Sequence, residues 1–156
     1  MSLRVLLAVD GFAHSRAAAD DLISHLRRDS VVVHVLHVVE IEELVPNADD
    51  FARGAEYGAD VVAHVDRGRR AADALVGDIA GPLTAAGFAT VTAVRDGDPR
   101  RAIVDYAAEH DCDWIVMGSH GRRGLERLLM GSVSEAVARH ARCTVHIARA
   151  RRSDNA

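Results

Sequence analysis

The segment 117–134 combines residue types that hold phosphate groups in proteins. It reads MGSHGRRGLERLLMGSVS and begins at the end of an apolar run. Gly118 and Gly121 leave room for a phosphate beside the backbone. Gly131 and Ser132 open a helix-like stretch, whose first N–H groups and dipole attract anions. One interpretation is an anion site; the other is a glycine-rich turn followed by an ordinary Ser helix cap.

Asp10 is a second candidate, because it directly follows the apolar run Val5–Val9. A carboxylate at the carboxyl end of a parallel strand can hold a ribose hydroxyl or a hydrated Mg²⁺. The same carboxylate can instead cap the turn Gly11–Ser15 that leads into the next helix. We favour the site, and the cap remains the alternative.

The basic residues restrict the chemistry further. All 19 are Arg, and the chain contains no Lys. A Walker-type phosphate site, a Schiff base and a Lys general base are therefore excluded. A phosphate site in this chain must use backbone N–H groups, hydroxyls, Arg or a metal ion.

Catalytic motifs are scarce. The chain has no GxSxG elbow and no GxGxxG after the first apolar run, which disfavours a serine hydrolase and a dinucleotide-dependent oxidoreductase. Ser119 and His120 are adjacent, but no oriented Ser–His–Asp set is evident. His34 and His37 lie three residues apart on an expected strand, so they face opposite sides and do not form a zinc pair.

The elements that must position these residues follow from hydrophobic patterning. Near-continuous apolar runs are typical of parallel strands that are covered on both faces. Five such runs occur: Val5–Val9, Val31–Val39, Ala89–Val94, Trp114–Met117 and Thr144–Ala148.

Stretches with apolar residues three and four apart separate these runs and predict helices. Asp98 and Pro99 have the types expected of an N-cap and a first helical residue. The alternation of strand and helix predicts a layered α/β fold with right-handed crossovers. The four predicted helices are Ser15–Arg28, Ala71–Ala86, Pro99–Glu109 and Ser132–Ala141.

Length and composition indicate one globular domain, residues 1–149, followed by a polar C-terminal tail, 150–156. The chain has 156 residues, 49% of them apolar, and a net charge of −4. Aromatic residues are only 4%, so we expect no nucleic-acid partner.

No apolar run is long enough for a signal peptide or a membrane span, so we expect a cytoplasmic protein with Cys112 and Cys143 reduced. The acidic stretch Glu40–Gly54 is expected to be a surface excursion.

The glycine spacing adds a resemblance to a known family. Gly118-x-x-Gly121, then nine residues, then Gly131-Ser132 resembles the ATP-binding signature of the universal stress protein family. The flanking residues resemble the family pattern in the same order over nearly the whole chain. These residues are Asp10-Gly11, Ser15-Arg16-Ala17, His37-Val38, Gly97-Asp98-Pro99, Asp113 to Gly118 and Cys143 to Ile147.

The resemblance implies a three-layer α/β/α sandwich with a five-stranded parallel sheet, of the adenine-nucleotide α-hydrolase-like, Rossmann-like type. It also implies that ATP, AMP or ADP binds with Mg²⁺ across the ends of the first and fourth strands. His120 is expected either to touch a phosphate or only to occupy the loop. The implied nucleotide-binding residues are Ala8, Val9, Asp10, Val38, Met117, Gly118, His120, Gly121, Arg122, Gly131, Ser132, Val133 and Ser134.

The implied role is that of a stress-response regulatory protein. No catalytic residues are identified, and the activity expected is at most that of a slow ATPase. Two alternatives remain: a Mg²⁺-dependent ATPase or nucleotidyl-transfer enzyme on the same fold, and an interaction module without nucleotide. The resemblance also implies a homodimer through the last strand, Thr144–Ala148. Phe12 departs from the pattern, because the family often has a small hydroxyl residue there.

Overall fold

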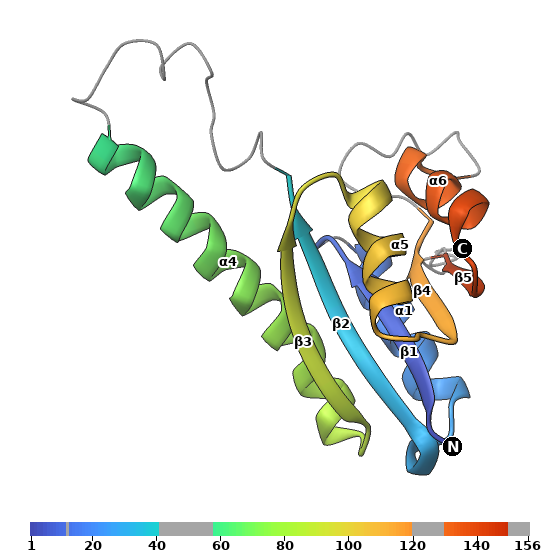
Figure 1. The fold of residues 1–156 in the computed structure, drawn as a ribbon. Coiled ribbons are helices and arrows are strands. Elements are labelled where there is room, and N and C mark those ends of the chain that lie inside the picture. The colour runs from blue at the N-terminus through green and yellow to red at the C-terminus, as the bar shows by residue number, and fades with distance from the viewer. Residues whose placement is uncertain (12, 41–57, 120–129, 150–156) are drawn as a thin grey trace, which may run out of the picture.

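Five parallel strands form the sheet of the computed structural model, which describes residues 1–11, 13–40, 58–119 and 130–149. The strand order is β3-β2-β1-β4-β5 (Figure 1). This confirms the predicted five-stranded parallel sheet. The strands are β1 (Leu3–Val9), β2 (Val31–Val39), β3 (Ala89–Asp96), β4 (Trp114–Gly118) and β5 (Thr144–Ala148).

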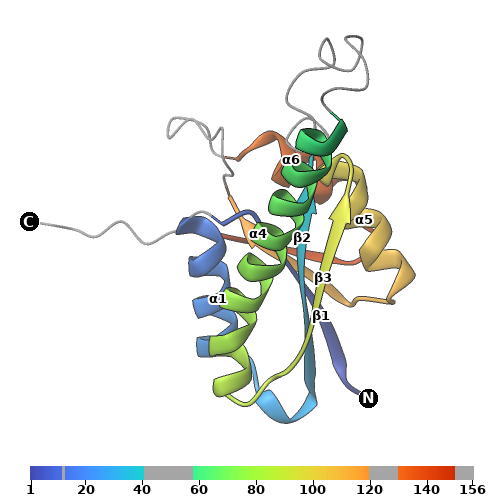
Figure 2. The same ribbon diagram turned by 90° about the vertical axis from the view of Figure 1, so that its left-hand side faces the viewer.

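Helices cover both faces of this sheet, so the predicted three-layer sandwich is confirmed. Figures 1 and 2 show α1 and α4 on one face and α5 and α6 on the other. A short 3-10 turn, η1 (Arg28–Ser30), leads into β2. The helices are α1 (Ala13–His25), α4 (Gly58–Ala85), α5 (Pro99–Glu109) and α6 (Ser132–His140).

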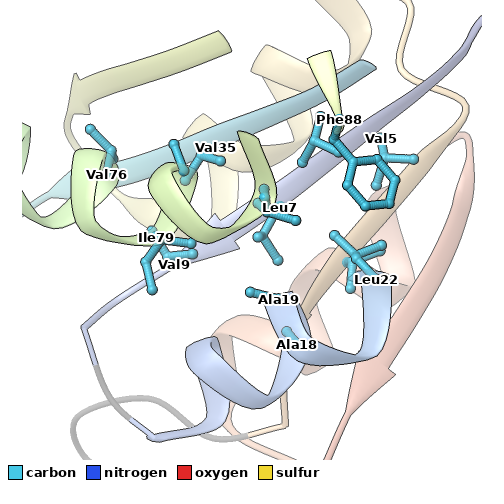
Figure 3. Close-up of a cluster of buried hydrophobic side chains, with 14 of the residues drawn as sticks. Val5, Leu7, Val9, Ala18, Ala19, Leu22, Val35, Val76, Ile79 and Phe88 are labelled. Carbon is cyan, nitrogen blue, oxygen red and sulfur yellow. The ribbon is translucent and has the colours of Figure 1, made fainter. Parts of the chain in front are cut away.

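The central strand β1 shows why its sequence is apolar at consecutive positions. Val5 and Leu7 pack toward α1 and α4, where Leu22 and Ile79 meet them (Figure 3). Leu6, on the opposite face of β1, belongs to the second core cluster, under α5 and α6. Each fully buried Val or Leu side chain contributes about 1.5–3 kcal/mol, so β1 anchors both halves of the core.

The order of the strands places a topological switch point between β1 and β4. From β1 the chain moves outward to β2 and β3, and α5 then carries it back to β4, on the other side of β1. The strand order therefore reverses between β1 and β4. In open parallel sheets, ligands bind beyond the carboxyl ends of the strands at this switch point.

Two helix boundaries test the sequence predictions. Asp98 caps α5, since its Oδ1 accepts a hydrogen bond from the Arg100 N–H at 3.0 Å and Pro99 is the first helical residue, as predicted. The helix predicted from Ala71 instead begins at Gly58. Its first half extends past the sheet (Figure 1), so the apolar periodicity that revealed the second half is weak there.

Parts of the predicted organisation lie outside the described residues. The acidic excursion is among them except for Glu40, and so is the tail 150–156. Among the described helices, none has the length and hydropathy that a membrane span requires.

Candidate functional site

The switch point brings the ends of β1 and β4 side by side. Ala8 pairs with Met117 in the parallel register, so Asp10 and Ser119 follow neighbouring strands at the same edge. The segment that joins Ser119 to α6 begins here. The structure therefore places the predicted strand ends and the start of the glycine-rich segment at one location.

A buried serine holds Asp10. The Asp10 N–H donates to Ser15 Oγ at 2.9 Å, and the Ser15 hydroxyl donates to Asp10 Oδ1 at 2.7 Å. Ser15 is only 2% exposed. Gly11 has φ +85°, a conformation that side chains other than that of Gly rarely adopt, and it turns the chain toward α1. Asp10 is thus joined to α1 through the Ser15 hydroxyl, and both its role as a helix cap and its role toward a ligand remain predictions.

A histidine from β2 contacts the same strand end. His37 Nδ1 lies 2.7 Å from the carbonyl oxygen of Val9, and a carbonyl only accepts, so Nδ1 carries the proton. Sequence reasoning assigned no site role to Ser15 or His37. The available signals were a histidine near the end of an apolar run and a serine five residues after Asp10.

Three of the predicted site residues form an apolar wall. Ala8, Val38 and Met117 come from β1, β2 and β4, and all three belong to the core cluster under α5 and α6. They are 7%, 9% and 6% exposed, and Val133 of α6 packs against the same cluster. The side chain of Val9 belongs to the opposite cluster, so Val9 reaches this edge through its backbone.

The start of α6 is tied to the end of β4. The Gly131 N–H donates to the Ser119 carbonyl oxygen at 2.7 Å, and the Ser134 hydroxyl donates to the same oxygen at 3.0 Å. Ser134 Oγ also lies 3.0 Å from the Gly131 carbonyl oxygen, and Ser134 is 2% exposed. These bonds hold the two ends of the glycine-rich segment together.

This arrangement determines which N–H groups remain for an anion. Gly131 is the N-cap, and the first helical bond runs from the Glu135 N–H to the Gly131 carbonyl at 3.0 Å. The N–H groups of Ser132, Val133 and Ser134 precede that bond and have no acceptor within the helix. The expectation that the Gly131 N–H also faces phosphate needs correction, because that group already donates to Ser119.

Gly118 has a packing role that sequence reasoning did not identify. A β-carbon on this residue would lie 2.5 Å from the His14 β-carbon and 3.0 Å from the His14 carbonyl carbon. The start of α1 thus packs directly on the end of β4, and glycine is required there whether or not a ligand binds.

Four residues singled out in the sequence lie outside the described part of the chain. These residues are Phe12, His120, Gly121 and Arg122.

The predictions on metal ligands concern residues that are described. The described residues contain no group of three or more His, Cys, Asp or Glu side chains arranged to hold a metal ion. His34 and His37 face opposite sides of the sheet, as predicted: His34 Nδ1 lies 3.0 Å from the Tyr106 hydroxyl, under α5.

Comparison with known proteins finds relatives that are named universal stress proteins. A putative universal stress protein of Staphylococcus saprophyticus is 27% identical over 147 residues, which cover 93% of this chain and 82% of the relative. A universal stress protein of Methanothermobacter thermautotrophicus is 48% identical over 56 residues, 36% of this chain. This match covers only 38% of the length of the Methanothermobacter protein. A match to the universal stress protein MJ0531 of Methanocaldococcus jannaschii likewise covers only 32% of the length of that protein.

Solved structures share the fold. The hypothetical protein MJ0577 has a TM-score of 0.82 at 24% identity, with 98% of this chain and 99% of that chain covered. The universal stress protein UspA of Lactobacillus plantarum has a TM-score of 0.72 at 25% identity, with 94% and 97% covered. A family member from Arabidopsis thaliana, solved with AMP bound, has a TM-score of 0.64 at 18% identity, with 99% and 96% covered.

A family model also matches most of the chain. The match runs from residue 1 to residue 149, and so includes the five strands and the four α-helices of the described residues. With that coverage, the chain belongs to the universal stress protein family.

Proposed function

We propose that this protein binds an adenine nucleotide, ATP with Mg²⁺, beyond the carboxyl ends of β1 and β4 and acts as a stress-response regulatory protein. The observation that carries the proposal is the start of α6. There, the N–H groups of Ser132, Val133 and Ser134 have no helical acceptor and lie beside the switch point. The helix dipole adds a partial positive charge to the same place.

The apolar wall supports the adenine end of this proposal. An adenine ring needs apolar contacts, and a largely buried apolar surface lies beneath the same edge of the sheet. This surface consists of Ala8, Val38 and Met117. The relative from Arabidopsis thaliana is described with AMP bound, and another universal stress protein, at a TM-score of 0.58 and 22% identity, in complex with cAMP. These ligands are adenine nucleotides, as proposed for this chain.

The triphosphate requires more positive charge than three N–H groups supply. Since the chain has no Lys, Arg122 and Mg²⁺ are the proposed sources of that charge. Mg²⁺ keeps several waters and is commonly held by phosphate oxygens together with one or two carboxylates. Asp10, which directly follows β1, is the proposed protein ligand.

Rapid ATP hydrolysis is not part of the proposal. Two carboxylates near this edge have other roles: Asp10 is assigned to Mg²⁺ and accepts from Ser15 at Oδ1, and Glu135 pairs with Arg139 at 2.8 Å. Neither is set up as a base for an attacking water. We therefore expect turnover far below the roughly 10 s⁻¹ that is typical of enzymes.

The nucleotide and its phosphates are tested by two measurements. Mass spectrometry of the small molecules released from denatured, purified protein should identify an adenine nucleotide. Titration calorimetry should then rank ATP above ADP and ADP above AMP, because each added phosphate extends toward α6. Equal affinity for AMP and ATP would place the phosphates elsewhere.

One observation favours the alternative of an interaction module without nucleotide. The packing against His14 explains Gly118 without any ligand. That alternative predicts no released nucleotide and no heat with any adenine nucleotide, so the same two measurements separate it from the proposal.

The same proposal includes a homodimer through β5. This strand is at one end of the strand order, with β4 on its inner side. The Thr144 N–H donates to the Asp113 carbonyl, and the Ala148 carbonyl accepts from the Ser119 N–H. Because the backbone groups of alternate residues point to opposite sides of a strand, those of Val145 and Ile147 face the outer edge. A second copy of β5 is the proposed partner.

A further inference from the structure

The peptide unit between Val9 and Asp10 is held at both of its polar atoms by side chains from two other elements. Its carbonyl oxygen, on Val9, accepts from His37 Nδ1 of β2 at 2.7 Å. Its N–H, on Asp10, donates to Ser15 Oγ of α1 at 2.9 Å. The Ser15 hydroxyl in turn donates to Asp10 Oδ1 at 2.7 Å, so the carboxylate is held together with the peptide.

These bonds fix the orientation of a peptide that lies beyond the end of its strand, where such a constraint is usually absent. Within a sheet, the ladder of backbone hydrogen bonds orients each peptide, and beyond the last paired residue that constraint ends. Val9 is the last residue of β1 and pairs with His37 in the register. Here side chains continue the constraint by one peptide beyond the ladder, to Asp10 at the switch point.

We propose that His37 and Ser15 are positioning residues, which fix the Val9–Asp10 peptide and thereby aim the Asp10 carboxylate at a bound adenine nucleotide and its metal ion. This inference rests on the proposed function. A carboxylate that is oriented before binding loses less conformational entropy when the ligand arrives, so the clamp increases affinity without touching the ligand. We call His37, Ser15 and this peptide the Asp10 clamp.

The geometry of the side chains provides matched variants. Nδ2 of Asn is bonded to Cγ, as Nδ1 of His is, so His37→Asn keeps a donor at the same position. His37→Leu places a methyl group there and removes the donor. His25 offers a control, because its Nδ1 also lies near a backbone carbonyl, that of Asp21 at 2.9 Å, but on the exposed end of α1.

The first arm of the test needs no ligand. ¹⁵N NMR of the imidazole nitrogens at about pH 8 reports which nitrogen of neutral His37 carries the proton. The clamp requires the proton on Nδ1 and none on Nε2, and His37→Leu identifies the signal by its loss. A proton on Nε2 would overturn the clamp.

The second arm measures ATP affinity by calorimetry in the presence of Mg²⁺. His37→Leu and Ser15→Ala should each weaken binding by about tenfold or more, whereas His37→Asn and His25→Leu should stay within about threefold of the wild type. In the Asp10→Ala background, His37→Leu should cost little more, because the clamp acts through Asp10. A full additional loss in that background would mean that His37 acts by another route and would overturn the positioning role.

The two arms separate the two failures. If the wild type binds no adenine nucleotide, the proposed function fails and the positioning role falls with it. The proton on Nδ1 would then show that the clamp is only an element of the fold. If the wild type binds ATP and His37→Leu binds equally well, the proposed function stands and the inference is wrong.

Discussion

The α-carbon of Gly118 lies so close to His14 that a β-carbon on it would be 2.5 Å from the β-carbon of His14. Two backbone atoms of His14 would also be within 3.1 Å, so rotation of the His14 side chain cannot relieve the contact. The amino end of α1 is thereby held against the carboxyl end of β4, next to the switch point.

Gly118→Ala should therefore destabilise the fold by about 1–3 kcal/mol, as overpacking of a tight site does. Gly77→Ala is the matched control: Gly77 lies within α4, and a β-carbon there meets nothing within 4 Å. That variant should be stabilised by about 0.5–1 kcal/mol, because Ala favours the helix. Urea unfolding measures both, and a Gly118→Ala protein as stable as the wild type would refute the close approach.

The stability of the protein should fall as the pH drops below about 6.5. Burial lowers the pKa of His34 from its ordinary value of 6.5, and the charges of His110 and Arg4 lower it further. The folded protein then binds fewer protons than the unfolded chain below pH 6.5, so acid favours unfolding; above that pH the effect is absent.

His34→Asn tests this pH dependence, since its Nδ2 can keep the contact with the Tyr106 hydroxyl without taking up a proton. Unfolding measured between about pH 7.5 and pH 5 should show a shallower decline in His34→Asn than in the wild type. His25→Asn, at an exposed histidine, should leave the decline unchanged. A wild type that gains stability on acidification over this range would contradict the account.

Cys112 should be nearly inert toward thiol reagents in the folded protein. Burial raises the pKa of this thiol from 9.0 to about 11, and the neighbouring Cys143 adds to the rise. A rise of two units lowers the fraction of reactive thiolate about 100-fold. In a Cys143→Ser background burial remains the main cause of the rise, so labelling of native protein at about pH 8 should still be about tenfold or more slower than labelling in denaturant. Equal rates would show that Cys112 is not buried.

The proposed dimer can be tested at one backbone group. Val145→Pro removes an N–H that faces the outer edge of β5 and spares the bonds of Thr144 and Ala148 to the β4 side. Sedimentation at micromolar concentration should give a dimer for the wild type and for Val145→Thr, and a monomer for Val145→Pro. Circular dichroism checks the fold of each variant. A monomeric wild type, or a dimeric Val145→Pro, would rule out this edge.

Much of the fold could be predicted from local patterns. The bounds of β2 match its apolar run, because a Val-rich strand inside a parallel sheet is buried on both faces. The bounds of β5 match as well, although this edge strand is buried only at Ala148. The first half of α4 escaped prediction because it extends past the sheet and has less apolar surface to bury.

The sequence indicated individual residues of the candidate site, but it did not indicate the contacts between them. Spacing along the chain indicated Asp10 and the start of α6, and the resemblance to the universal stress protein family implied site roles for Ala8, Val38 and Met117. The bond from Gly131 to Ser119 and the contact of Gly118 with His14 join residues far apart in the sequence. No periodicity encodes such contacts, which depend on how the helices settle on the sheet.

The central claim is that the first N–H groups of α6 hold the phosphates of ATP, and Ser132 allows one of them to be removed. Proline is favoured at the first position of a helix, and Gly131 has φ −76° and ψ 163°, which suits a residue before proline. Ser132→Pro should therefore keep the fold and lose one donor. Ser132→Ala keeps the N–H and is the control. Calorimetry with ATP and Mg²⁺ should show binding by the wild type and by Ser132→Ala, and an affinity about tenfold or more weaker for Ser132→Pro. Undiminished binding by Ser132→Pro, or no heat from the wild type with any adenine nucleotide, would contradict the account.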